Sequence, residues 1–155
     1  MKDNYLRRAI IREIYEGDTI TKCDVDLGYD CWNHNQSFRL YGINTPEIKT
    51  GTAASKELGR LARDTFRTLL DLADGQCYLQ SIKESLKDEK RNKKGKYGRW
   101  LAIVYLHLPD NVSMKINGFD FNPPNGVPVC YNDLVVSLGL GKLYLKDKKY
   151  IRDTL

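Results

Sequence analysis

Residues 9–27 read AIIREIYEGDTITKCDVDL, and this stretch decides the predicted fold. Ala9 to Tyr15 is a mostly apolar run, and the Glu16-Gly17-Asp18 that follows is typical of a turn. Thr19 to Leu27 then alternates over most of its length before it meets Gly28. Two such runs joined by a short turn predict a β-hairpin at the start of the domain.

Three further strands are expected downstream of this hairpin. Ser37–Tyr41 is one, because period two sends Phe38 and Leu40 to the same face. Gln76–Ile82 is the next, and the last is Arg99–Leu106, which is apolar on both faces and therefore predicted to be central.

A long helix is predicted between the third and fourth strands, capped by Thr52 or Ser55 and ended by Asp74-Gly75. Its expected apolar positions recur at helical spacing and are Ala54, Leu58, Leu61, Ala62, Thr65, Leu69 and Leu72. A short helix is expected over Asn132–Leu138, and Gly139 ends it.

The remaining segments are predicted to be irregular or terminal. Lys83–Gly98 is highly charged and is expected to be an exposed loop, whereas Lys146–Leu155 favours a charged helix. Residues 107–131 hold four of the five prolines, which predicts a surface insertion rather than a linker. Residues 1–155 are thus expected to be one α+β domain, a five-stranded OB-type barrel with packed helices.

Composition narrows the class of protein. The 155 residues carry 25 Lys and Arg against 20 Asp and Glu, and the net charge of +5 favours a polyanionic partner such as nucleic acid. No stretch approaches 18 uncharged apolar residues, so we expect no membrane span. The start of the chain has no apolar run of signal-peptide length. We therefore expect a cytoplasmic protein, unless a leader has been removed.

The four cysteines form no CxxC pair, and the two histidines match no zinc spacing. Free thiols in a reducing compartment are the favoured interpretation, and a Cys23–Cys31 disulfide is the alternative if the chain is exported.

Acids and arginines gather in three short segments: Glu16–Thr19, Phe38–Glu47 and Lys96–Arg99. The second places Arg39 in a strand and then Asn44, Thr45 and Glu47 near its end, whereas the third places Arg99 where the most apolar strand begins. Hard oxygens suit a cation such as Ca²⁺, a carboxylate can deprotonate water, and arginines can bind phosphate through two N–H groups. These residues are the parts of a phosphodiester-hydrolysing site, but their spacing alone favours the competing interpretation, a set of structural salt bridges.

These segments resemble the staphylococcal nuclease (thermonuclease) family. The resemblance rests on EGDT at 16–19, on FRL at 38–40 with NTPE at 44–47, on KYGR at 96–99 with LA at 101–102, and on NDLV at 132–135 with GL at 139–140. It extends from about Ile10 to Tyr144. It implies a barrel of the OB type with packed helices, and a Ca²⁺-dependent nuclease that cuts DNA and RNA to 3′-phosphate ends.

The resemblance also implies roles for single residues. Asp18 would be a metal ligand, Thr45 would supply a backbone carbonyl and Glu47 would be the general base. Arg39 and Arg99 would hold the scissile phosphate. Lys96 and Tyr97 would contact the neighbouring phosphate, and Tyr144 would lie near the substrate base; these three are the expected substrate-binding residues.

Some residues depart from the family pattern. Asn44 stands where a carboxylate ligand is usual, so Ca²⁺ affinity should fall or another divalent cation should be preferred. The 107–131 segment has no counterpart in the compact members. Cysteines without a leader suit a bacterial cytosol or a phage-infected cell. We expect a monomer that acts on nucleic acid with little base specificity, because phosphate contacts carry no sequence information.

Two other functions remain open. The first is a catalytically weak or inactive nucleic-acid-binding module of the OB type, and the second is a protein-interaction domain. The presence of Asp18, Arg39, Glu47 and Arg99 argues for the enzyme, and Asn44 argues for the binding module.

Overall fold

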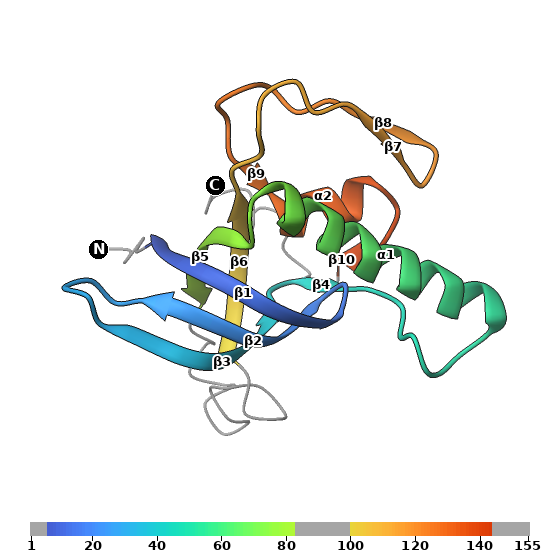
Figure 1. Cartoon of the computed structure of the whole chain (residues 1–155). Coiled ribbons are helices and arrows are strands. Elements are labelled where there is room, and N and C mark those ends of the chain that lie inside the picture. The colour runs from blue at the N-terminus through green and yellow to red at the C-terminus, as the bar shows by residue number, and fades with distance from the viewer. Residues whose placement is uncertain (1–5, 83–99, 144–155) are drawn as a thin grey trace.

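The computed structural model describes residues 6–82 and 100–143. Its barrel strands are β1 (Leu6–Glu16), β2 (Thr19–Asp26), β3 (Trp32–Leu40), β5 (Gln76–Ile82) and β6 (Trp100–Leu106). The shorter strands are β4 (Ile43–Asn44), β7 (Met114–Ile116), β8 (Phe119–Phe121), β9 (Val129–Cys130) and β10 (Lys142–Leu143). The helices are α1 (Ala53–Leu72) and α2 (Tyr131–Ser137), and Figure 1 shows both beside the barrel.

The main strands form a closed barrel in the order β3–β2–β1–β5–β6. A parallel pairing of β3 with β6 closes it, with Phe38 opposite Trp100 and Leu40 opposite Ala102. The other pairings around the barrel are antiparallel. The predicted barrel is confirmed at this level: a closed five-stranded mixed barrel with two helices, compatible with an α+β fold of the OB type.

The predicted strand bounds agree with the structure for β5 but not for β3. β5 runs over the predicted Gln76–Ile82, but β3 begins at Trp32 rather than at Ser37. The added residues pair with β2 as far as Asp26, which lies opposite Trp32. Most of these added residues are exposed, so they show no apolar alternation by which a strand could have been predicted.

Helix α1 begins at the predicted cap, where the Thr52 hydroxyl accepts a hydrogen bond of 3.1 Å from the Ser55 N–H. It ends before Asp74 and Gly75, whose φ angles of 56° and 74° lie in the left-handed region. These two residues reverse the chain into β5, as the sequence predicts.

The predicted buried face of α1 was partly wrong. Ala54 is exposed, and Leu61 and Leu72 are 37% and 36% exposed. Ala54 lies in the first turn, which extends beyond the barrel (Figure 1). Leu61 is about 100° around the helix from its buried neighbour at position 62, because successive residues turn by that angle. The residues that α1 does bury are Gly59, Ala62, Thr65, Phe66, Leu69 and Leu70.

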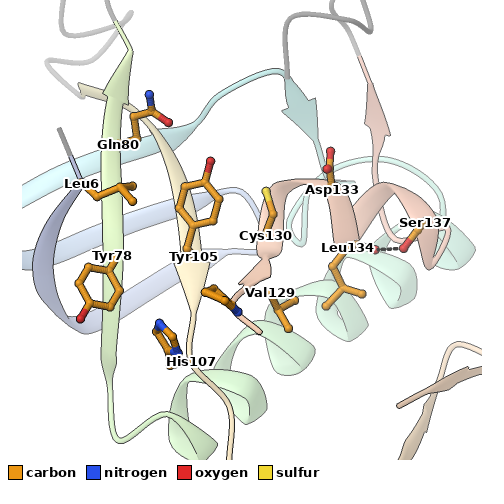
Figure 2. A pocket seen from close by; sticks show the side chains of 11 residues that line it. Leu6, Tyr78, Gln80, Tyr105, His107, Val129, Cys130, Asp133, Leu134 and Ser137 are labelled. Atoms are coloured by element: carbon orange, nitrogen blue, oxygen red, sulfur yellow. Dashed lines mark hydrogen bonds between the residues drawn. The ribbon is translucent and has the colours of Figure 1, made fainter. Parts of the chain in front are cut away.

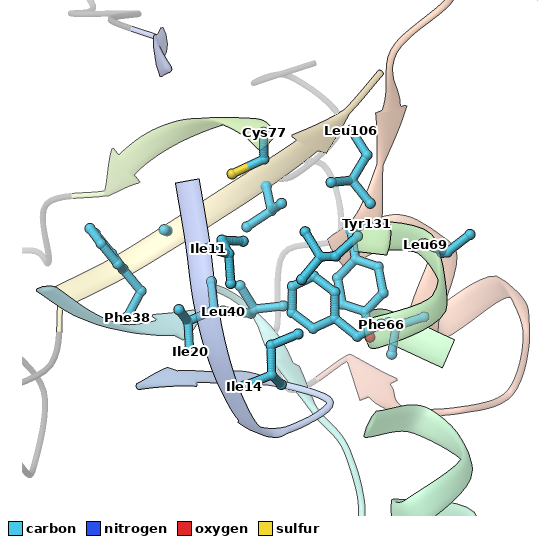
Figure 3. Packing of buried hydrophobic residues seen from close by; sticks show 14 of the residues in the cluster. Ile11, Ile14, Ile20, Phe38, Leu40, Phe66, Leu69, Cys77, Leu106 and Tyr131 are labelled. Carbon is cyan, nitrogen blue, oxygen red and sulfur yellow. The ribbon is translucent and has the colours of Figure 1, made fainter. Parts of the chain in front are cut away.

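Two aromatic rings occupy the contact between α1 and α2. Phe66 and Tyr131 stack with ring centroids 3.9 Å apart and an interplanar angle of 17° (Figure 3). Both are fully buried among the apolar side chains that fill the barrel. Burial raises the pKa of Tyr131 well above its usual value, and Asp18 adds to this effect. Its hydroxyl therefore remains a neutral donor, and it bonds the Gly17 carbonyl oxygen at 3.1 Å.

Helix α2 matches the predicted short helix to within one residue at each end. Gly139 follows it with a φ of 70°, as expected for a residue that ends a helix. The Asn132 side chain is fully buried: its amide nitrogen donates to the carbonyl oxygens of Tyr41 and Ala102, and its oxygen accepts from the Val104 N–H. This residue attaches α2 to β6 and to the end of β3.

The 107–131 segment contains the β7–β8 hairpin and then β9, which pairs with β6. Ile116 and Phe121 of the hairpin are 6% and 7% exposed and join the main apolar core. The Asn117 side chain donates a 2.8 Å hydrogen bond to the Leu138 carbonyl. The segment is therefore anchored at the end of α2 rather than held only by its two ends.

All four cysteines are free thiols, so the disulfide alternative is not formed. Burial, with a smaller effect of Asp24, raises the pKa of Cys23 to about 12. No helix in the described part of the chain is long and apolar enough to cross a membrane.

Candidate functional site

Asp18 lies in the two-residue turn between β1 and β2, and it is 1% exposed although it carries a carboxylate. Its Oδ1 accepts a 2.8 Å hydrogen bond from the Thr19 hydroxyl and lies 3.1 Å from Nη1 of Arg39. Its Oδ2 accepts a 2.9 Å hydrogen bond from the Thr45 N–H. A buried carboxylate needs such partners, because water no longer solvates it.

Arg39 reaches this carboxylate from β3, where it lies opposite Thr19 of β2. Its Nη2 donates to the Ile43 carbonyl at 3.3 Å and also to Oδ1 of Asn44. The guanidinium therefore joins two of the predicted ligand side chains, Asp18 and Asn44. Within the described residues, its Nε–H has no hydrogen-bond partner, and the side chain is 23% exposed.

Asn44 ends the short strand β4, which pairs with β10 so that Asn44 lies opposite Lys142. Thr45 follows and is 6% exposed. Its hydroxyl oxygen is buried and has no hydrogen-bond partner among the residues that the structure describes. The predicted metal ligands Asp18, Asn44 and Thr45 are thus brought together beside Arg39.

Two glycines let the surrounding backbone approach this closely. A Cβ at Gly17 would lie 2.8 Å from the Ala62 Cβ, and one at Gly59 would lie 2.5 Å from the Pro46 carbonyl oxygen. Real Cβ atoms do not come so close, so α1 could not pack against both the β1–β2 turn and the 45–47 loop with larger residues there. Tyr131 also donates its hydrogen bond to the Gly17 carbonyl oxygen.

Glu47 is exposed, as Asn44 is, whereas Asp18 and Thr45 are buried. Its carboxylate accepts a hydrogen bond from the Thr50 hydroxyl. It forms no ion pair with Arg39 or with another cation of the described chain. The predicted base is therefore in solvent, and among the described residues only Thr50 orients it.

Four predicted residues lie outside the described part of the chain: Arg99, Lys96, Tyr97 and Tyr144. Their sequence neighbours Trp100 and Leu143 belong to β6 and β10, and these strands pair with β3 and β4. Both partner strands carry site residues, Arg39 and Asn44.

The donor chemistry of the cluster fits a hard cation. Asp18 supplies a carboxylate, Asn44 an amide oxygen, and Thr45 an unpartnered buried hydroxyl besides its carbonyl. Oxygen donors of this kind are those that Ca²⁺ and Mg²⁺ prefer. No three His, Cys, Asp or Glu side chains among residues 6–82 and 100–143 are placed to hold a metal ion together, so the donor set around Asp18 relies on neutral oxygens.

Sequence reasoning missed the residues that support the cluster, namely Gly17, Gly59, Tyr131 and the side-chain role of Asn132. The hydrogen bond between Tyr131 and Gly17 spans 114 positions, and those of Asn132 reach β3 and β6. Gly17 and Asn132 stand within the segments that resemble the family, EGDT at 16–19 and NDLV at 132–135, but these patterns do not say what either residue contacts.

A second buried carboxylate, Asp24, lies farther along β2. Its Oδ1 accepts a 3.0 Å hydrogen bond from the Asn35 N–H and lies 3.2 Å from Nδ1 of His34, while Nε of Arg12 lies 2.5 Å from Oδ2. The Asn35 N–H chiefly, and then His34 and Arg12, lower the Asp24 pKa. These contacts link β1, β2 and β3, and we interpret them as structural.

Comparisons with known proteins add no family: no protein-family model and no curated protein matches the chain. The fold and the cluster around Asp18 thus describe a closed five-stranded barrel, compatible with the OB type, that carries an acid–arginine site.

Proposed function

We propose that this protein is a metal-dependent nuclease with a fold of the staphylococcal nuclease type. It hydrolyses phosphodiester bonds in DNA and RNA with little base specificity and leaves 3′-phosphate ends. The supporting observation is the convergence of Asp18, Arg39, Asn44 and Thr45 on one place from the β1–β2 turn, β3 and β4. In the family that the sequence resembles, these four positions belong to one site.

Asp18, Asn44 and Thr45 are the residues that would hold a divalent cation, Ca²⁺ or a related ion. When bound, such an ion stabilises negative charge on phosphoryl oxygens and lowers the pKa of a water molecule. The unpartnered Thr45 hydroxyl supports this assignment, because a buried polar atom without a partner costs free energy unless a ligand satisfies it.

Arg39 binds the scissile phosphate in this proposal. A guanidinium can hold two phosphate oxygens at once and neutralise charge that develops in the transition state. In the structure Arg39 instead holds oxygens of Asp18 and Asn44. Substrate phosphate therefore competes with these two side chains for the guanidinium, and its binding releases their oxygens.

Glu47 removes a proton from the attacking water. Its exposure leaves room for water on the carboxylate, and the hydrogen bond from Thr50 restricts its orientation. Arg99 is the second phosphate-binding arginine of the proposal, and it directly precedes Trp100, the residue opposite Phe38 next to Arg39.

A nucleic-acid-binding module without strong catalysis is the second candidate. The observation in its favour is the contact of Arg39 with both Asp18 and the uncharged Asn44, which gives these two predicted ligand side chains a partner within the protein. The net charge of +5 suits either function.

Cleavage of end-labelled single-stranded DNA and RNA separates the candidates. Cleavage with Ca²⁺ but not with a chelator supports the nuclease, and treatment with a 3′-phosphatase identifies the ends. Salt-sensitive binding without cleavage supports the module. A protein that neither cleaves nor binds these strands would contradict both candidate functions. The matched control is Arg63→Ala, because Arg63 pairs with Asp64 on the surface of α1.

A further inference from the structure

A cavity of about 830 Å³ lies on the outside of the barrel, where β5 and β6 meet β9 and α2 (Figure 2). None of its lining residues belongs to the cluster around Asp18. Its size is within the range of small-molecule sites, which are typically about 300–1,000 Å³. Nothing in the proposed nuclease function uses this cavity.

Flat aromatic surfaces line one side of the cavity. Tyr78 of β5 and His107 meet edge to face, with ring centroids 5.5 Å apart at 72°, and Tyr105 of β6 lies beside them in Figure 2. Burial chiefly, with the neighbouring Cys130 and Asp133, raises the pKa of Tyr105 to about 12. The phenol therefore stays neutral, and its ring can stack on another flat ring without a charge to be desolvated.

Gln80 is the polar group that points to a ligand. It lines the cavity from β5 and is only 5% exposed. Its side-chain amide forms no hydrogen bond with any residue in the described ranges. The amide oxygen and nitrogen are not among the fully buried, unpartnered atoms of the described residues, so they reach the open space of the cavity, where a ligand can bind them. A carboxamide offers one donor and one acceptor in the same plane, which is complementary to the edge of a nucleobase.

The opposite side of the cavity carries Asp133 and Ser137 of α2 (Figure 2). The Ser137 hydroxyl donates a 2.9 Å hydrogen bond to the Leu134 carbonyl, so its oxygen lone pairs are directed elsewhere. A carboxylate and a hydroxyl oxygen accept hydrogen bonds from sugar hydroxyls, whereas the carboxylate repels a phosphate. The polar groups thus favour an uncharged ligand.

We propose that this cavity binds a nucleobase, with its ring against Tyr105 and Tyr78 and its edge on the Gln80 amide. The observations that select this chemistry are the neutral aromatic surfaces together with one carboxamide that opens on the cavity and has no hydrogen-bond partner among the described residues. The base can belong to a free nucleoside or to a strand, and the two sources share this recognition. The inference does not depend on the nuclease function.

Calorimetric titration of the full chain with adenosine tests the proposal. We expect saturable binding with a dissociation constant of order 0.1 mM, from the usual free energy per ligand atom. Gln80→Leu should weaken binding about tenfold, since it removes both amide partners at similar volume. The control is Gln36→Leu, because Gln36 lies on β3 and bonds Asn33 and His34 instead. It should bind adenosine as the wild type does.

A second measurement locates the ligand in the wild type, so that the test does not rely on the folding of a variant. Adenosine should shift the ring signals of Tyr78, Tyr105 and His107 in NMR spectra and leave those of Tyr15 unchanged. If oligodeoxyadenylate causes the same shifts, the base can come from a strand. If only adenosine causes them, the ligand is a free nucleoside. The proposal would be overturned if no saturable binding is seen at adenosine concentrations of about ten times the expected dissociation constant. It would also be overturned if folded Gln80→Leu binds adenosine as tightly as the wild type, or if adenosine shifts signals of other residues instead.

Discussion

The Thr45 N–H donates a hydrogen bond of 2.9 Å to the Asp18 carboxylate, although the two residues are 27 positions apart in the sequence. This bond joins the β1–β2 turn to the residue that follows β4. The same carboxylate contacts Arg39 and the Thr19 hydroxyl, so one side chain holds three segments of the site.

Removal of this carboxylate should destabilise the fold. Asp18→Ala leaves the buried Thr45 N–H and the Arg39 guanidinium without their partner, and breaking such a buried pair costs about 3 kcal/mol. Urea denaturation measures the change. Asp120→Ala, at an exposed position on β8, is the matched control and should change stability little. A loss below about 1 kcal/mol would show that Asp18 does not organise this end of the barrel.

Arg39→Ala should reduce the rate of DNA cleavage by at least about a hundredfold, the scale of losing one donor that stabilises developing charge. Arg99→Ala should have a similar effect. Arg39→Lys should not restore the rate, because an ammonium cannot reproduce the planar guanidinium. Single-turnover cleavage assays measure these rates beside Arg63→Ala. Full activity in folded Arg39→Lys would contradict the proposed role in phosphate binding.

Glu47→Gln should depress the rate strongly and leave stability nearly unchanged. The residue is exposed and bonds only Thr50 among the described side chains, so the amide costs little in folding. It cannot accept the proton of an attacking water. Cleavage rates and circular dichroism together test both statements. The control is Glu57→Gln on the exposed surface of α1, and a near-normal rate in the Glu47 variant would show that it is not the base.

Asn44→Asp should tighten Ca²⁺ binding about tenfold, or about 1.4 kcal/mol, because it adds a ligand charge. The new carboxylate would also pair with Arg39, which already donates to the Asn44 side-chain oxygen. Calorimetric titration with Ca²⁺ measures the affinity, with Asn125→Asp at an exposed position as the control. An unchanged affinity would mean that position 44 does not face the metal.

Acid should weaken the barrel partly through Asp24. Its pKa is lowered in the folded state, chiefly by the Asn35 N–H and then by His34 and Arg12. A lowered folded-state pKa means that the stabilisation is present above the unfolded-state value, about 3.9, and is lost as the pH falls through the folded-state value. Asp24→Asn should therefore show a smaller loss of stability between pH 5 and acid than the wild type does, measured by urea denaturation. Parallel losses in the two proteins would contradict this linkage, and Asp120→Asn serves as control.

The sequence by itself determined the order and type of the main elements. The β1–β2 hairpin, β5, β6, α1 with its Thr52 cap and α2 with Gly139 all follow from local patterns, because turn residues, caps and apolar periodicity act over a few positions. It also indicated that Asp18, Arg39, Asn44 and Thr45 act together, through their likeness to a family pattern. Glu47 was found with them, but its exposure and its hydrogen bond from Thr50 were not apparent.

Only the tertiary structure decided how these elements meet. The parallel pairing of β3 with β6, the contact of Asp18 with Thr45 and the bond from Tyr131 to Gly17 each join residues far apart in the chain. The same holds for the Gln80 cavity, whose walls come from β5, β6, β9 and α2. Local patterns carry no signal for such contacts, because burial at a given position depends on which surface packs against it. Leu61 shows this physical limit, since it has helical spacing and an apolar side chain yet faces solvent.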